Sequence, residues 1–298
     1  MRNLPALPIS SERSEIMTGL IVEGGASRSY FAIGVMDAMM ENKIEIDYIT
    51  GASAGISNAL NYASGQIGRG IKLGLEHLPK KEYSGLRHML NPKNRSLYNI
   101  DYVFNKIPNE LEKYDYEAFR NFKGYAEAAV TNVETGIAEY LKVTPDDKSW
   151  KILVASCSLP IMFPIVELDG KKYLDGGIAD SIPFERAISV GCDKIIVLLS
   201  RERTYIKKAG GEEKYTARLF KKYPEFQKTL INRSNMYNCQ REKLFELEKE
   251  NKAFVFCPED TTTWRRTEKD PTKIKAMYDE GYRLGLEKID ELKKYLRY

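Results

Sequence analysis

Apolar and polar positions in the N-terminal part of the chain predict a strand, a helix, a second strand and a second helix, in that order. The first strand covers residues 18–22, and the second lies near 46–50. The apolar positions of the two helices recur at helical spacing: Phe31, Val35, Ala38 and Met39, then Ile56, Ala59, Leu60 and Ala63. Strands that alternate with helices in this way predict an α/β fold, in which helices cover both faces of a parallel sheet.

The rest of the chain continues this pattern after a largely helical insert at about 56–122, which forms either a substrate wall or lid, or a surface subdomain. Short helices are predicted inside it at 98–104 and 115–119. Two hairpins follow, at 126–143 around Glu134-Thr135-Gly136 and at 166–174 around Asp169-Gly170. The remaining predictions are helices at 147–157, 184–190, 201–250 (one or two) and 271–297, and strands at 194–199 and 253–257. We expect a single domain over 18–298, with a lead-in at 1–17.

Composition and charge narrow the function classes. The chain has 298 residues, of which 43% are hydrophobic and 30% charged, as is typical of a globular protein with a sizeable core. Its net charge of +4 permits attraction to anionic surfaces, and the chain has no RNA-binding, zinc-knuckle or helix-turn-helix signature, so no nucleic acid is expected as a partner. A basic run at 201–250 is interpreted either as a surface for peripheral contact with an anionic membrane, or as a solvated helix face.

The four cysteines are scattered, with no Cys-x-x-Cys pair, so the sequence predicts no metal site, no cofactor and no disulfide framework. Cys192 and Cys257 lie in or beside apolar runs and are expected to be buried thiols. This cysteine usage favours a reducing compartment and therefore a cytoplasmic location, at most peripheral to the inner membrane face. Residues 1–14 have no apolar stretch long enough for a signal peptide, and the longest apolar runs are too short to span a bilayer.

The stretch around Ser53 reads Gly51-Ala52-Ser53-Ala54-Gly55, between the second strand and the second helix. A Gly-x-Ser-x-Gly sequence in the order strand, sharp turn, helix is the geometry of a nucleophile elbow, which exposes the serine hydroxyl. Gly51 and Gly55 allow strand and helix to pass closely. Ser53 is therefore a candidate nucleophile, against the alternative of an ordinary glycine-rich turn.

A serine nucleophile needs a group that accepts its proton. The two histidines, His77 and His88, both lie in the helical insert, and none follows them, so the serine-acid-histidine order of α/β-hydrolases is impossible here. A carboxylate that acts directly on the serine remains, and Asp175 is the best candidate. It lies at a strand end and is followed by Gly176 and Gly177, which leave space around the carboxylate.

A third motif follows the first strand and precedes a helix: Gly24-Gly25-Ala26-Ser27-Arg28. Consecutive backbone amides at a helix start form an anion hole, which can hold the oxyanion of an ester carbonyl while Arg28 adds positive charge. A dinucleotide fingerprint is disfavoured, because Ala26 and Ser29 replace its second and third glycines. A P-loop is disfavoured because no Gly-Lys-Ser/Thr follows.

The three motifs, in this order, resemble those of the patatin-like phospholipase family, and of its bacterial stand-alone members most. Two further segments agree with the resemblance: Ala155-Ser156-Cys157-Ser158-Leu159-Pro160, with Phe163 and Pro164, and Asp180-Ser181-Ile182-Pro183. The resemblance covers about residues 18–200. It implies a three-layer α/β fold and metal-free cleavage of lipid acyl esters by a Ser-Asp dyad. On this chain, Ser53 would be the nucleophile and Asp175 the base, with an oxyanion hole from Gly24, Gly25 and Ala26, Ala54 as a further donor, and Arg28 in support.

This chain departs from the family pattern at two positions. Glycine is common in the family where Ala26 stands, and also where Ser29 stands. If either position needs a positive φ, a non-glycine residue there costs about 1 kcal/mol or more. The sequence leaves three functions open: a lipid acyl hydrolase, an acyltransferase that uses the same dyad, and a lipid-binding protein without catalytic activity.

Overall fold

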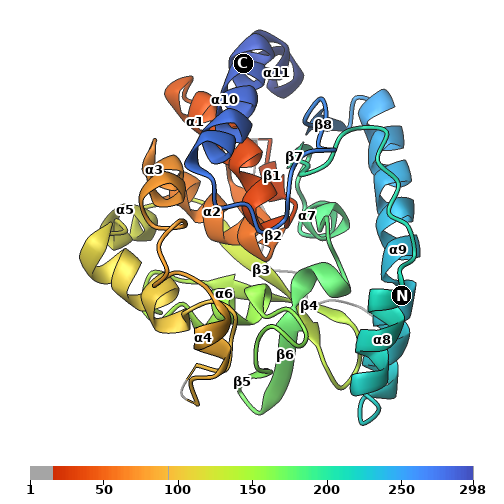
Figure 1. Ribbon diagram of the computed structural model, residues 1–298. Coiled ribbons are helices and arrows are strands. Elements are labelled where there is room, and N and C mark those ends of the chain that lie inside the picture. Colours follow the sequence, from red (N-terminus) through yellow and green to blue (C-terminus); the bar gives the residue numbers. More distant parts are fainter. Residues whose placement is uncertain (1–15, 93, 298) are drawn as a thin grey trace.

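Eight strands form one mostly parallel sheet in the computed structural model, which describes residues 16–92 and 94–297 (Figure 1). The order along the sheet is β5-β6-β3-β2-β1-β7-β8, and β4 pairs with β3. Strands β1, β2, β3, β7 and β8 run parallel, whereas β4, β5 and β6 belong to the antiparallel hairpins. The parallel sheet and both hairpins are as predicted. The strands are β1 (Thr18–Val22), β2 (Tyr48–Ala52), β3 (Tyr125–Asn132), β4 (Ala138–Val143), β5 (Val166–Leu168), β6 (Lys171–Asp175), β7 (Lys194–Leu198) and β8 (Ala253–Phe256).

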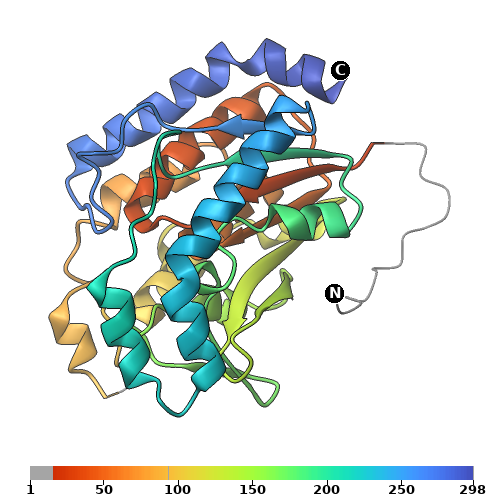
Figure 2. The same ribbon diagram turned by 90° about the vertical axis from the view of Figure 1, so that its right-hand side faces the viewer.

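Helices cover both faces of the sheet, and the alternation of side chains along β1 shows how (Figure 2). Leu20 and Val22 point to one face and Ile21 to the other, as the period of two requires. The first face is covered by α1 (Tyr30–Glu41), α2 (Ala54–Ala63), α6 (Lys151–Cys157), α10 (Pro271–Glu287) and α11 (Ile289–Leu296). The second face is covered by α7 (Phe184–Ser189) and α9 (Pro224–Lys249), with α8 (Gly211–Leu219) beside α9.

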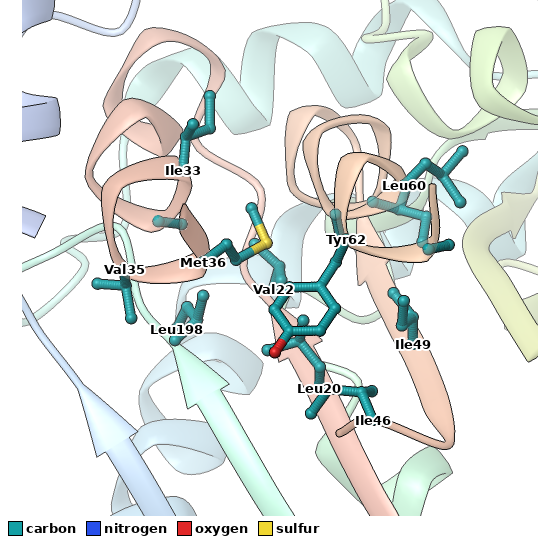
Figure 3. Close-up of a cluster of buried hydrophobic side chains, with 14 of the residues drawn as sticks. Leu20, Val22, Ile33, Val35, Met36, Ile46, Ile49, Leu60, Tyr62 and Leu198 are labelled. Atoms are coloured by element: carbon teal, nitrogen blue, oxygen red, sulfur yellow. The ribbon is translucent and has the colours of Figure 1, made fainter. Parts of the chain in front are cut away.

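The larger hydrophobic core lies between the sheet and the helices α1 and α2 (Figure 3). Side chains from both helices meet those of β1, β2 and β7: Ile33, Val35, Met36, Leu60, Tyr62, Leu20, Val22, Ile49 and Leu198. All of these side chains are buried. Because such close-packed interiors resist deformation, the ends of β1 and β2 are held firmly in place.

Helices α1 and α10 pack so closely that glycine is required between them. A Cβ added to Gly281 would lie 1.9 Å from the carbonyl oxygen of Phe31, and one added to Gly34 would lie 2.1 Å from that of Tyr278. The phenol of Tyr278 also donates a hydrogen bond to the buried Asp37 carboxylate at 2.9 Å. The C-terminal part of the chain is therefore fixed against the first helix.

The insert between α2 and β3 is helical, as predicted, but one helix differs in extent. Its elements are α3 (Arg69–Glu76), α4 (Leu86–Met89), the π-helical η2 (Tyr102–Leu111) and α5 (Tyr116–Arg120). Asp115 caps α5 by accepting a hydrogen bond from the Ala118 amide. The prediction of a short helix at 98–104 is wrong at both ends. Tyr98 pairs with Ser84 in an isolated β-bridge, and the helical segment starts at Ile100 and continues through η2.

Other predicted boundaries also need correction. The helix predicted at 271–297 is two helices, because the chain turns at Lys288 and the Tyr295 hydroxyl then hydrogen-bonds to the backbone of Ile195 and of Lys252. The helix predicted at 147–157 begins only with α6. Most of the lead-in lies outside the described residues, but Met17 is buried and its amide donates to Asp193. Across residues 16–92 and 94–297, no helix is both long and apolar enough to cross a bilayer.

Candidate active site

The sheet register brings Ser53 and Asp175 to the same edge, one on each side of β3. Ala52, the last residue of β2, lies opposite Ala129 of β3, and the next residue of β3, Val130, lies opposite Asp175 of β6. Two strand spacings correspond to about 10 Å between the outer backbones. The two side chains can bridge this distance, and both line one pocket.

Ser53 occupies a strained turn between β2 and α2. Its backbone has φ 56° and ψ −134°, which is rare for a residue with a side chain. Gly55 makes the turn possible, because a Cβ there would lie 2.3 Å from the carbonyl oxygen of Val22. The Ser53 amide donates to the Ser156 hydroxyl at 2.9 Å, and that hydroxyl donates to the Ala129 carbonyl at 2.7 Å. Ser156 therefore fixes the elbow to β3.

The Asp175 carboxylate is buried, with 2% of the residue exposed. Its Oδ1 accepts a hydrogen bond from the Gly177 amide at 2.8 Å, whereas its Oδ2 has no partner of normal hydrogen-bond geometry among the described residues. Burial raises the pKa of Asp175 above its usual range. The Ser53 hydroxyl, the guanidinium groups of Arg233 and Arg266, and the Gly177 amide oppose this rise. The Asp175 carboxylate and the Ser53 hydroxyl are thus neighbours, without yet forming a well-aligned hydrogen bond.

Neither histidine has Ser53 as a partner. His77 Nδ1 lies 2.9 Å from the Tyr102 hydroxyl, and His88 Nε2 lies 3.0 Å from the Lys81 carbonyl oxygen. Another candidate nucleophile in this region is Cys157, whose sulfur lies 3.4 Å from the Ser57 hydroxyl. Burial raises the pKa of Cys157 to about 12, so this thiol is protonated at neutral pH and a poor nucleophile.

Residues 24–28, here called the glycine-rich loop, lie beside Ser53. Gly24, Gly25 and Arg28 line the pocket that contains Ser53 and Asp175. Gly25 caps and Ala26 begins the short helix η1 (Ala26–Ser29), where the first amides have no partner within the helix. The Ala54 amide is likewise at the first turn of α2. Amides in the first turn of a helix are the backbone donors from which proteins build anion holes.

The two departures from the family pattern differ in their backbone. Ala26 adopts φ 48°, so this position is left-handed and alanine is strained there. Ser29 has φ −69°, which suits any residue. Its hydroxyl donates to the Ala26 carbonyl at 2.6 Å and accepts from the Asn58 side chain at 2.8 Å. Ser29 thus ties the glycine-rich loop to α2.

Two cavities of different character meet at Ser53. An apolar cavity of about 180 Å³ extends from Ser53 between α2, α6 and the helical insert. Its walls include Tyr30, Leu73, Val103, Phe104, Ile107 and Leu153. On the other side, a pocket of about 70 Å³ contains Asp175 and is lined mainly by charged and polar side chains. We call these the apolar cavity and the polar pocket.

The two glycines that follow Asp175 lie in the short helix η3 (Gly176–Ile178), directly after β6. The Gly177 carbonyl accepts hydrogen bonds from the Ser181 hydroxyl and from Nε of Arg233, both at 2.8 Å. A Cβ on Gly176 would lie 2.0 Å from the Ala129 carbonyl oxygen, so only glycine fits. The backbone that carries Asp175 is therefore held by both β3 and α9.

Comparison with known proteins identifies the family. The sequence model of the patatin-like phospholipases matches residues 20–188, more than half of the chain. The chain belongs to the patatin-like phospholipase family. The matched stretch includes the glycine-rich loop, the elbow and Asp175. A second model, for a domain of unknown function (DUF6363), matches residues 223–297, which contain α9, β8, α10 and α11.

Relatives share mainly the patatin part of the chain. Uncharacterized protein YjjU of Escherichia coli is 27% identical over 185 residues, which cover 60% of this chain and 50% of YjjU. Lysophospholipase NTE1 of Saccharomyces cerevisiae is 24% identical over 186 residues, which cover 60% of this chain and 10% of NTE1. The match thus spans half the length of YjjU and a tenth of NTE1. The crystal structure of VipD from Legionella pneumophila is similar with a TM-score of 0.47 and 15% identity, over 93% of this chain and 67% of that chain.

Several residues that contact the candidate site around Ser53 and Asp175 were not predicted from the sequence. Ser156 lies in the segment 155–160, which agrees with the family resemblance but predicts no role for this serine. Arg233 lies in the basic run at 201–250, which was interpreted as lipid-facing or solvated. The loop between β8 and α10 also reaches the site. The Ser27 amide donates to the Arg266 carbonyl at 3.1 Å, and the Ser27 hydroxyl donates to the Glu268 carbonyl at 2.8 Å. The basic composition of 201–250 was the one available signal, and it does not identify which side chains turn inward.

The expectation for the cysteines needs one correction. Cys192 is buried, as predicted, but Cys257 is only partly buried. Cys257 lies just past the end of β8, where the chain leaves the sheet, so its side chain is less covered than those of the strand itself. All four cysteines are free thiols.

Proposed function

We propose that this protein hydrolyses carboxylic esters of lipids, with Ser53 as nucleophile and Asp175 as the base. The observation that carries the proposal is that Ser53 lines both cavities, so its hydroxyl adjoins a buried carboxylate on one side and an apolar cavity on the other. Membership in the patatin-like phospholipase family supports lipid hydrolysis as the general class of activity.

The proposed reaction has two stages. Asp175 removes the proton from the Ser53 hydroxyl as the oxygen attacks the ester carbonyl, and the negative charge on the carbonyl oxygen is held by the amides of Gly25, Ala26 and Ala54. Collapse expels the alcohol, which takes the proton back from Asp175, and leaves an acyl group on Ser53. Asp175 then removes a proton from water as the water oxygen attacks this acyl group, and it returns the proton to the Ser53 oxygen as the fatty acid leaves. The raised pKa of Asp175 makes the carboxylate a stronger base than an exposed aspartate.

The apolar cavity suits the acyl chain, since its walls are mainly hydrophobic and it begins at the nucleophile. Two leucines of the helical insert support peripheral contact with a lipid surface. Leu86 begins α4 and Leu90 follows its last residue. They are 74% and 84% exposed, and neighbouring exposed apolar side chains are a feature of membrane interaction sites. We therefore propose that the helical insert contacts the lipid surface through these two leucines.

Short-chain nitrophenyl esters test the proposal, with Ser53→Ala and Asp175→Asn as variants. Both should lose nearly all activity, and an organophosphonate should label Ser53 in the wild-type protein alone. Activity in either variant equal to that of the wild type would overturn the proposed roles. Mass spectrometry of products from a lipid extract, with and without added glycerol, distinguishes release to water from transfer to an alcohol.

A further inference from the structure

The polar pocket beside Ser53 carries an excess of positive charge. Five cationic side chains line it, contributed by the glycine-rich loop, the segment after β7, α9 and the loop before α10: Arg28, Arg201, Lys207, Arg233 and Arg266. Two carboxylates line it as well, Glu23 and Asp175. The pocket therefore holds more cations than it needs for its own neutrality.

The two carboxylates are engaged elsewhere. The Glu23 carboxylate accepts hydrogen bonds from the Tyr237 hydroxyl and from the Ser200 amide, both at 2.7 Å. Asp175 Oδ1 accepts from the Gly177 amide. Four of the cations, namely Arg28, Arg201, Lys207 and Arg266, form no ion pair within 4.0 Å with any described carboxylate. The positive charge is thus not neutralised within the described part of the chain.

Burial, and after it repulsion by neighbouring cations, lowers the pKa of two of these side chains. Burial and the neighbouring Arg201 and Arg266 lower the pKa of Arg28 to about 10, although Glu23 opposes this. Burial, Arg233 and Arg266 lower the pKa of Lys207 to about 8, against Glu213 and Glu23. In addition, Nε of Arg28 is buried and has no hydrogen-bond partner among the described residues. Like charges crowded into a cleft are typical of a site whose ligand carries the opposite charge.

The geometry points to an anionic phosphate group as the ligand of the polar pocket. Resting on the ester hydrolase function proposed above, we propose that the preferred substrates are lipid esters whose headgroup contains a phosphate and no ammonium group. Arginine and lysine are the side chains that proteins use for phosphate recognition. In a glycerophospholipid the phosphate is a few bonds from the ester, so an acyl chain in the apolar cavity and a phosphate in the polar pocket would place the ester at Ser53.

The pocket disfavours a zwitterionic headgroup. An ammonium group beside the phosphate would meet the same cations, and the carboxylate of Glu23 already has both oxygens occupied. The two tyrosines that line the pocket are covered as well: Arg201 lies 4.4 Å from the centre of the Tyr205 ring, and Lys207 lies 5.4 Å from that of Tyr237. Neither ring face is therefore open on that side to a choline group.

The region of unknown function contributes to this specificity. Arg233 and Arg266 both lie within residues 223–297, outside the patatin match. Arg233 is anchored to the Gly177 carbonyl, and the backbone of Arg266 is anchored to Ser27. We therefore assign to this region the supply of two of the five cations of the polar pocket.

The experiment compares short-chain phosphatidylglycerol and phosphatidylcholine with the same acyl chains, both below their micellar concentrations, so that recruitment to a surface does not contribute. A nitrophenyl ester of the same acid serves as the substrate without a headgroup. The test variant is Lys207→Gln/Arg266→Gln. The matched control is Lys208→Gln/Arg265→Gln, which removes the same charge from the adjacent, exposed positions outside the pocket.

Wild type should hydrolyse phosphatidylglycerol about tenfold faster than phosphatidylcholine, or more, because both lipids present a phosphate but only the choline ammonium group is repelled by the cations of the pocket. In the test variant, the phosphatidylglycerol rate divided by the nitrophenyl ester rate should fall about tenfold, whereas the control variant should keep the wild-type ratio. Equal rates for the two lipids, or the same ratio in both double variants, would overturn the headgroup proposal.

Two further measurements separate the sources of phosphate and the two proposals. Glycerol phosphate should bind Ser53→Ala in calorimetry and bind the same protein with Lys207→Gln/Arg266→Gln at least about tenfold more weakly. Binding of inorganic phosphate to this pocket without any lipid preference would assign the pocket to free phosphate and overturn the lipid part. A wild type that hydrolyses no ester overturns the proposed function, whereas one that hydrolyses esters without headgroup preference overturns this inference alone.

Discussion

Replacing Ala26 by glycine should stabilise the protein, although it removes a side-chain atom. The backbone of Ala26 has φ 48°, where a Cβ costs about 1–2 kcal/mol. Glycine gains more freedom in the unfolded chain, which offsets about 0.4–1 kcal/mol of this. Ala26 is partly exposed, so little packing is lost. The net expectation is a free energy of unfolding higher by about 0.5–1 kcal/mol, as an average over these ranges.

The matched control is Ser29→Gly, at the other position where the family commonly has glycine. Ser29 has an ordinary helical backbone, so glycine relieves no strain there. The substitution removes the hydrogen bonds that its hydroxyl forms with the Ala26 carbonyl and the Asn58 side chain. Each such bond contributes about 1 kcal/mol, and we expect a loss of about 1–2 kcal/mol.

Urea unfolding of the three proteins measures both effects, provided that the slope of each transition is the same. The Ala26→Gly midpoint should lie above that of the wild type and the Ser29→Gly midpoint below it. A lower midpoint for Ala26→Gly would refute the argument that this loop stores backbone strain. A higher midpoint for Ser29→Gly would show that the serine does not tie the loop to α2.

Three further predictions concern buried groups. The Arg186 guanidinium is 8% exposed and donates to the Glu127 carboxylate at 2.8 and 2.9 Å, so Glu127→Gln, which leaves it without its charge partner, should lower the free energy of unfolding in urea by about 3–5 kcal/mol. The double variant Glu127→Leu/Arg186→Met should recover most of this loss. A single variant within about 1 kcal/mol of the wild type would contradict the prediction. Gly281→Ala should cost about 1–3 kcal/mol or more, with hydrogen exchange accelerated most in α10, because its Cβ would meet the Phe31 carbonyl; unchanged exchange in α10 would rule out the clash. Asp175→Asn should raise the urea midpoint at neutral pH. The pKa of Asp175 is raised in the folded protein, so its ionised form lowers the free energy of unfolding as the pH rises through that pKa. The stability gained by the variant should therefore shrink as the pH falls toward 3.8, the ordinary pKa of aspartate. An Asn variant less stable than the wild type at neutral pH would contradict that account.

The backbone turns that form the site could be predicted from the sequence, because their geometry requires particular residues at neighbouring positions. Gly55 is needed where a helix start passes within van der Waals contact of β1, and such a demand leaves a fixed residue at a fixed spacing. The hairpin at Asp169-Gly170 was predictable for the same reason, since both residues adopt positive φ there. The parallel pairing of the central strands followed from alternating strands and helices.

The sequence could not predict which cationic side chains line the polar pocket. Lys207 and Lys208 are adjacent and chemically identical, yet only the first lines the pocket. Arg266 and Arg265 present the same problem. Which member of each pair lines the pocket depends on how β7, α9 and the loop before α10 meet, and this is a property of the folded chain. The break at Lys288 likewise depends on the packing of Tyr295 against β7 and β8.

The hydrogen bonds from Ser27 to Arg266 and Glu268 have a consequence for the order of events during synthesis. A ribosome makes Ser27 241 residues before Glu268, and domains fold as their chains emerge. Until the later residues leave the exit tunnel, the earlier ones lack two of their supports. A nascent chain should therefore gain activity only after residues 266–268 have emerged.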